Sequence, residues 1–317
     1  MAEHSIYRDI AERTGGDIYI GVVGPVRSGK STFIKRFMEA LVLPNMGDGY
    51  SRDRARDEMP QSAAGKTVMT TEPKFIPDEA VTVKLDDNAV MRVKMIDCVG
   101  YIVPDAMGTV ENGQPRMVRT PWSQEPMPFI EAAEMGTHKV ITEHATIGML
   151  VTTDGSIGDI PRASYVEAEE RVVRELKEMG KPFALILNSA KPDSDEATAL
   201  AYELETKYGV PVALVSCLEL DAEDIRHILE LVLLEFPVTE VRVRLPEWTT
   251  ALEPAHRIHA SVIGQLRQAA DRVREIGGIR TAFVILRFHP GKSPEQINQF
   301  LFACDIKSCQ FTDDAVV

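Results

Sequence analysis

The sequence predicts an α/β fold in which a mostly parallel sheet carries helices on both faces, followed by a small partial α+β domain. Short apolar runs alternate with helical patterns over residues 147–236, which is typical of parallel strands joined by crossover helices. A glycine-rich loop also joins an apolar run to a helical pattern within residues 17–43. The length of 317 residues and the 44% hydrophobic content suit one or two globular domains.

The first 128 residues are expected to contain few regular elements and two long loops. Phe33, Phe37 and Leu41 recur at the spacing of a helix. Two runs that alternate apolar and polar residues predict a β-hairpin. In chain order we expect a strand over 17–24, a helix over 33–43, an irregular segment over 45–78, the hairpin strands 81–85 and 90–97, and an irregular segment over 98–128.

The next hundred residues are more regular. Pro161 and Gly180 bracket a strong helical pattern, as expected for a proline near a helix start and a glycine after its end. The expected helices are 129–144, 161–180, 195–208 and 221–236, and the expected strands are 147–153, 183–188 and 210–216. Pro237 ends the alternation, and a strand over 241–245, a helix over 251–276 and a strand over 282–288 are expected after it.

The charge of the chain excludes some partners. It has 35 Lys and Arg against 48 Asp and Glu, a net charge of −13. Such a chain is a poor candidate for binding nucleic acid or an anionic membrane by charge. Residues 241–317 hold 10 basic and 8 acidic residues, so the acidic excess belongs to the part before them. This shift places a domain boundary near residue 240.

Targeting and redox signals point to the cytoplasm. No apolar run approaches 18 residues, so the sequence predicts no transmembrane segment. The N-terminus carries charges where a signal peptide needs an apolar core. Free thiols are expected at the four cysteines, Cys98, Cys217, Cys304 and Cys309.

The glycine-rich loop carries the strongest chemical signal. Residues Gly24–Ser31 match G-x-x-x-x-G-K-[ST] at every required position, between a predicted strand and a predicted helix. Glycines let the backbone N–H groups surround phosphate oxygens, and the helix N-terminus favours an anion. Lys30 is expected to reach the β- and γ-phosphates, and Ser31 to ligate Mg²⁺. The expected nucleotide contacts here are Gly24, Pro25, Val26, Arg27, Ser28, Gly29, Lys30, Ser31 and Thr32.

Two weaker signals complete a switch-GTPase-like pattern. Asp97 ends a predicted strand and Gly100 follows in D-x-x-G spacing, which predicts Mg²⁺ binding by Asp97 through water and a close approach of Gly100 to the γ-phosphate. An ordinary turn at the end of a strand is the alternative. Thr70 or Thr71 could sense the γ-phosphate from the loop before the hairpin, or could simply begin a β-strand.

The expected base-reading motif is incomplete. A guanine-binding protein of this class carries [NT]-K-x-D after the next-to-last strand. Asn188 fits the first position and is a candidate nucleotide contact, but Ser189 replaces the lysine and Lys191 replaces the aspartate. The alternative register, Ala190 to Asp193, keeps the lysine and aspartate and loses the first position. The sequence therefore favours ATP over GTP.

Several long segments resemble the stage IV sporulation protein A family. They are IAERTGGDIYIGVVGPVRSGKSTFIKRFME, DEMPQSAAGKTVMTTEPKF, MIDCVGY, ENGQPRMVRTPW, EAAEMGT and TTDGSIGDI. The resemblance covers about residues 5–245 and implies a GTPase-like domain that hydrolyses ATP. By matched position it implies that Lys30 and Ser31 belong to the phosphate loop, that Thr70 and Thr71 are sensor threonines, and that Asp97 is the Mg²⁺-associated acid.

The resemblance also implies a biological setting. Members of this family polymerise into the basement layer of the spore coat on the outer forespore membrane, in the mother-cell cytoplasm. A small amphipathic membrane-bound peptide recruits them, and other coat proteins dock on them. Family chains continue beyond this length, and from about Phe288 the residues do not resemble the family. We therefore expect a P-loop ATPase domain over 1–238 and a truncated or divergent middle domain over 239–317. A conventional regulatory GTPase and a nucleotide-binding scaffold without turnover are the alternatives.

Overall fold

The sheet has the predicted α/β architecture. The computed structural model describes residues 16–46, 49–60, 73–86, 89–104, 106, 108–111, 113–238, 253 and 256–276. The strands of the main sheet are β1 (Asp17–Val23), β2 (Lys74–Asp86), β3 (Ala89–Asp97), β8 (Ile147–Thr153), β9 (Phe183–Asn188) and β10 (Val212–Val215). They follow the order β10-β9-β8-β1-β3-β2 within these residues. Neighbouring strands are parallel except β2, which is antiparallel to β3.

The register brings the carboxyl ends of three strands together. β1 is central, and Val22 is paired with Asp97 on β3 and with Met149 on β8. Ligands of open α/β sheets bind beyond the carboxyl ends of the strands. The loops after β1, β3 and β8 therefore meet at one edge of the sheet, where a ligand site is expected.

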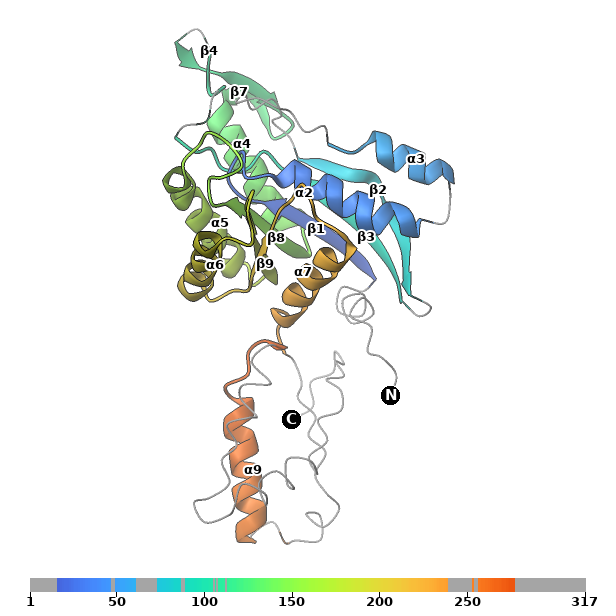
Figure 1. The fold of residues 1–317 in the computed structure, drawn as a ribbon, viewed down its shortest axis with the longest axis vertical. Helices are drawn as coiled ribbons and strands as arrows, with labels where there is room; N and C mark the ends of the chain where they lie inside the picture. The colour runs from blue at the N-terminus through green and yellow to red at the C-terminus, as the bar shows by residue number, and fades with distance from the viewer. Residues whose placement is uncertain are drawn as a thin grey trace. The chain divides into compact units, whose positions relative to one another are not determined.

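Helices cover both faces of the sheet, as predicted (Figure 1). They are α2 (Lys30–Phe37), α4 (Phe129–Lys139), α5 (Val166–Glu178), α6 (Asp195–Tyr208) and α7 (Ala222–Leu234). Short π-helical turns extend α2 and α4 over Met38–Val42 and Val140–His144, and 3₁₀ turns lie at Leu43–Asn45 and Arg162–Tyr165. Figure 1 shows α2 and α7 on the near side of the sheet and α4 behind it.

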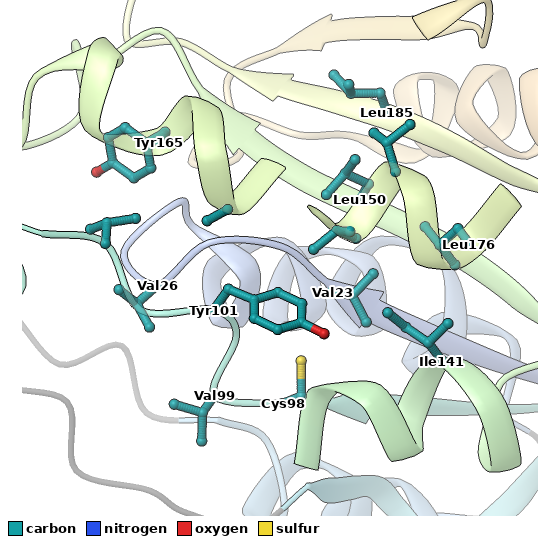
Figure 2. Close-up of a cluster of buried hydrophobic side chains, with 14 of the residues drawn as sticks. Val23, Val26, Cys98, Val99, Tyr101, Ile141, Leu150, Tyr165, Leu176 and Leu185 are labelled. Carbon is teal, nitrogen blue, oxygen red and sulfur yellow. The ribbon is translucent and has the colours of Figure 1, made fainter. Parts of the chain in front are cut away.

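One buried cluster joins the far face of the sheet to its helices. Figure 2 shows Val23 of β1, Leu150 of β8 and Leu185 of β9 gathered with Ile141, which follows α4, and Leu176 of α5. Each of these side chains is almost fully buried. Apolar burial of this kind is the main favourable term in folding, at about 25 cal/mol per Å². It fixes α4 and α5 against the strands that carry the site.

The structure differs from the sequence prediction in two segments expected to be irregular. The first contains α3 (Gly49–Asp57) and the start of β2 at Lys74. The second contains two small hairpins, formed by β4 (Val110–Glu111) with β5 (Gln114–Pro115) and by β6 (Met117–Thr120) with β7 (Ser123–Pro128). Of α3 only Ala55 is buried, so the helix has no apolar stripe for a sequence pattern to reveal.

The remaining chain forms a second compact unit. Residues Met1–Leu233 make up one unit and Leu234–Val317 the other. The described part of the second unit contains α9 (Arg257–Ala270), which lies within the predicted helix 251–276. Backbone hydrogen bonds join Val238 N to Arg274 O (2.9 Å) and Ile276 N to Phe236 O (3.1 Å). The strands predicted at 241–245 and 282–288 lie outside the described residues.

Candidate functional site

The loop between β1 and α2 needs both of its motif glycines. Gly24 and Gly29 have φ angles of 137° and 101°, which side chains rarely permit. A Cβ on Gly24 would lie 2.2 Å from the Val151 carbonyl oxygen, and one on Gly29 would lie 2.2 Å from Asn188 Nδ2. Gly29 is also the N-cap of α2, so the loop leads into a helix N-terminus, which attracts anions. Thr32 is half-buried in the first turn of that helix.

Lys30 lies folded back over this loop. Its side chain is buried, and Nζ donates hydrogen bonds to the carbonyl oxygens of Pro25 (2.7 Å) and Gly24 (3.3 Å). Burial lowers the pKa of Lys30, and the neighbouring Cys98 and Asp97 offset this only in part. An ammonium in such a dry site gains from a nearby anion, because the low local dielectric strengthens charge interactions. Lys30 is therefore placed to bind phosphate.

Ser31 and Asp97 meet at the mouth of the loop, as the two motifs predict. Ser31 Oγ donates to Asp97 Oδ2 at 3.0 Å, while the buried Asp97 Oδ1 has no hydrogen-bond partner among the described residues. Burial raises the pKa of Asp97, against the smaller effects of Lys30 and the Ser31 hydroxyl. A carboxylate and a hydroxyl oxygen are the hard ligands that Mg²⁺ prefers. The chemistry of these oxygens therefore suits Mg²⁺, and the unpaired Asp97 Oδ1 leaves one of them available to it.

Gly100 lies directly against the phosphate loop. It has φ 89°, and a Cβ there would lie 2.2 Å from the Gly24 carbonyl oxygen and 2.5 Å from Lys30 Nζ. The next residue continues the contact, because Tyr101 N donates to Gly24 O (3.2 Å) and Val26 N donates to Tyr101 O (2.9 Å). The structure thus brings the two predicted motifs together through their backbones.

Asn188 joins the phosphate loop to a neighbouring loop. Its Nδ2 donates to the Ser28 carbonyl oxygen (3.1 Å), and its Oδ1 accepts from Cys217 N (3.0 Å). Asn188 is 5% exposed, so both ends of its amide are used inside the protein. In the structure Asn188 therefore braces the phosphate loop from behind, and its contact with the nucleotide stays a prediction.

The residues at the two altered base-motif positions have different surroundings. Ser189 is buried, and its hydroxyl accepts from Lys191 N at 3.0 Å. Lys191 itself is exposed. A hydroxyl committed to a backbone N–H does not reproduce the long cationic side chain that a guanine-binding motif places here. In the register that starts at Asn188, the structure therefore places no lysine side chain at the position of Ser189.

The turn after β8 contributes Asp154 to the surroundings of the site, whereas the sequence predicted only a turn there. Asp154 Oδ1 accepts from Ser156 N (2.9 Å) and Ser156 Oγ (2.6 Å), and the same Ser156 hydroxyl accepts from Ala190 N (2.8 Å). Burial raises the pKa of Asp154, but hydrogen bonds from Ser156 and Ser189 outweigh this and the net shift is downward. An Asp-Gly-Ser turn is a recognised local signal, whereas its contact with residue 190 is not visible in the sequence.

Other expected site residues have simpler positions. Arg27 is half-buried with φ 65°, and the side chain of Ser28 is buried within the loop. Thr70 and Thr71 lie outside the described residues. Across the part of the chain that the structure describes, no group of three or more His, Cys, Asp or Glu side chains could hold a metal ion. No helix found there is long and apolar enough to cross a membrane.

The chain is similar to known proteins over most of its length. The family model described as "Stage IV sporulation protein A, ATPase domain" matches residues 1–237. "Stage IV sporulation protein A" of Clostridioides difficile (strain 630) is 53% identical over 288 residues, which cover 90% of this chain and 59% of that protein. The proteins of that name from Bacillus subtilis (strain 168) and Bacillus anthracis are 51% and 50% identical, each over 87% of this chain and 56% of the relative. The chain thus spans somewhat more than half the length of these relatives.

Proposed function

The chain belongs to the stage IV sporulation protein A family and carries its ATPase domain, and we propose on this premise that it binds ATP with Mg²⁺ and hydrolyses the bond between the β- and γ-phosphates. The observation that carries the proposal is the arrangement around the phosphate loop. The loop amides, the N-terminus of α2 and the buried Lys30 converge beside the Ser31–Asp97 pair.

Each residue has a proposed task in this reaction. The loop backbone and Lys30 bind the phosphate oxygens and neutralise the charge that develops on them. Ser31 and Asp97 would hold Mg²⁺, with Asp97 acting through a water molecule. When bound, the ion neutralises charge on the β- and γ-phosphates. Thr70 or Thr71 senses the γ-phosphate and helps to position the attacking water.

Adenine is proposed as the base. The support is that, in register with Asn188, a serine and a lysine stand where a guanine reader carries lysine and aspartate, and that Ser189 is buried. A pocket built for guanine leaves polar groups unpaired when adenine binds, so such sites discriminate strongly. The proposal therefore expects ATP to be preferred over GTP.

Hydrolysis is proposed to serve assembly. Family membership supports a role in sporulation, in which the protein polymerises into the basement layer of the spore coat at the outer forespore membrane, in the cytoplasm of the mother cell. Its further proposed partners are a small amphipathic membrane-bound peptide and other coat proteins. We assign the ATPase domain to residues 1–238 and a partial middle domain to 239–317. The extent of the family model supports this division.

The test is a nucleotide competition and phosphate-release assay, followed by sedimentation. Purified protein is expected to bind a labelled ATP analogue that unlabelled ATP displaces and GTP does not, and Lys30→Ala is expected to lose binding. Thr70→Ala/Thr71→Ala is expected to bind ATP without releasing phosphate. Binding of GTP and not of ATP contradicts the proposal and favours a regulatory GTPase, and ATP binding without phosphate release in the wild type favours a scaffold. If ATP leaves all the protein soluble, the assembly role is wrong for this chain.

A further inference from the structure

The amide of Gly100 does not point to the phosphate loop that it lies against. Gly100 N donates a hydrogen bond to the side-chain hydroxyl of Thr137, on α4, at 3.2 Å. Thr137 is fully buried, and its hydroxyl donates in turn to the Ala133 carbonyl oxygen at 2.9 Å. Because its proton is committed to Ala133, the Thr137 oxygen is held as an acceptor. The N–H of a residue that lies against Lys30 is therefore bound to a helix instead of to the loop.

The rest of this segment is anchored on both sides of Gly100. Cys98 Sγ donates to the Val22 carbonyl oxygen (3.3 Å), and Tyr101 exchanges two backbone hydrogen bonds with the phosphate loop. The Tyr101 ring lies in the buried cluster of Figure 2. Its hydroxyl donates to both carboxylate oxygens of Glu175 on α5, each at 2.6 Å, and the Arg171 guanidinium lies 4.2 Å from the ring centroid. Hydrogen bonds thus hold both sides of the peptide between residues 99 and 100.

Glycine at position 100 permits a rearrangement of this peptide. Its φ of 89° is a conformation that glycine leaves readily, because both signs of φ are accessible to it. A phosphate oxygen is also a stronger acceptor than a hydroxyl, since hydrogen bonds to charged groups are roughly twice as strong as neutral ones. Ligand and helix therefore compete for one N–H group.

From this geometry we infer that Thr137 is a positioning residue that holds the Gly100 amide away from the nucleotide, and that a γ-phosphate takes this amide from Thr137 when ATP binds. The inference rests on the proposed function and extends it. It makes α4 the element that loses a hydrogen bond when the γ-phosphate is present and regains it after hydrolysis. ADP, which has no γ-phosphate, leaves the Gly100–Thr137 bond in place.

The test compares Thr137→Val, which removes the acceptor at nearly constant volume, with Thr137→Ser, which keeps the hydroxyl. In Thr137→Val the hydroxyl that competes for the amide is gone, so affinity for a non-hydrolysable ATP analogue is expected to rise about two- to tenfold relative to ADP, the range of one buried hydrogen bond. Thr137→Ser is expected to keep the wild-type ratio. Without nucleotide, hydrogen exchange in the peptide 98–103 is expected to be faster in Thr137→Val and unchanged in Thr137→Ser.

The possible failures are distinguishable. An unchanged ratio of analogue to ADP affinity in Thr137→Val, or an equal loss for both ligands, overturns the inference and leaves the proposed function standing. A wild-type chain that binds neither nucleotide contradicts the proposed function, and with it the transfer of the Gly100 amide from Thr137 to the γ-phosphate. Unchanged hydrogen exchange in Thr137→Val contradicts the hydrogen bond between Gly100 N and Thr137 in the absence of nucleotide. Thr137→Ala, which also lacks the hydroxyl, carries the same expectations if the valine variant does not fold.

Discussion

Replacing Asn188 distinguishes two roles for this residue, a brace behind the phosphate loop and a contact to the base. Its amide joins the Ser28 carbonyl oxygen at 3.1 Å to the Cys217 N–H at 3.0 Å, across 160 positions in the first case. Asn188→Ala leaves both groups buried without their partner, and each such group costs about 1–3 kcal/mol. We expect the free energy of unfolding to fall by about 2–6 kcal/mol. Asn188→Asp keeps the acceptor for Cys217 but turns a carboxylate oxygen toward the Ser28 carbonyl, so it should be at least as damaging.

The decisive assay compares ATP with inorganic tripolyphosphate. A brace acts on the loop, so Asn188→Ala is expected to weaken both ligands by the same factor, about tenfold for a loss of about 1.4 kcal/mol. Urea unfolding gives the stability change and titration calorimetry gives the two affinities. Asn45→Ala is the matched control, because Asn45 makes one local hydrogen bond, to Leu41 O at 2.7 Å, away from the site. A variant that loses ATP affinity but binds tripolyphosphate as the wild type does would refute the brace and support base contact.

Three further predictions concern buried charge, the loop backbone and pH. Arg162→Met leaves the fully buried Glu169 without its bidentate partner, whose nitrogens lie 2.7 and 2.8 Å from the carboxylate oxygens. Urea unfolding should show that the free energy of unfolding falls by about 3–5 kcal/mol, and that much of this loss is recovered in Arg162→Met/Glu169→Met. Equal losses in the single and the double variant would contradict this. Gly24→Ala should reduce ATP affinity at least about tenfold, since its Cβ meets backbone at 2.2 Å, whereas Gly158→Ala, in open space, should bind normally. The lowered pKa of Asp154 means that it stabilises the fold above its ordinary pKa of 3.8 and that this contribution is lost as the pH falls through the lower folded value. The stability difference between wild type and Asp154→Asn should therefore shrink below about pH 4, and a constant difference would refute it.

The fold was largely predictable because its core strands are continuous apolar runs. β8 and β9 occupy the predicted residues 147–153 and 183–188, where every residue is buried. The elements that were missed lack such a pattern. The residues of β4 and β5 are exposed, and α3 has one buried residue. Where an element does not contribute to the core, its sequence carries no periodic apolar signal.

The candidate site was predictable only where its geometry is local. The Gly24–Ser31 motif fixes a loop, a helix start and a lysine within eight consecutive residues, so the sequence alone indicates phosphate binding. The partners of Asn188 and Gly100 depend on contacts between distant segments. Thr137 lies 37 positions from Gly100, on a helix whose apolar pattern explains its burial but not its hydrogen bond. Only the packing of α4 against the sheet brings the two together.

The central claim, that the loop around Lys30 catalyses ATP hydrolysis, is tested most directly by phosphate release. The measurement is the rate of inorganic phosphate release from saturating ATP and from saturating GTP, with Mg²⁺ present, for the wild type, Lys30→Ala and Lys35→Ala. Lys35 is a matched control because it lies on the same helix with a side chain 46% exposed and only a long 3.9 Å ion pair to Glu39. We predict release from ATP in preference to GTP, loss of release in Lys30→Ala and wild-type release in Lys35→Ala. Release that persists in Lys30→Ala, or that occurs with GTP alone, would contradict the account.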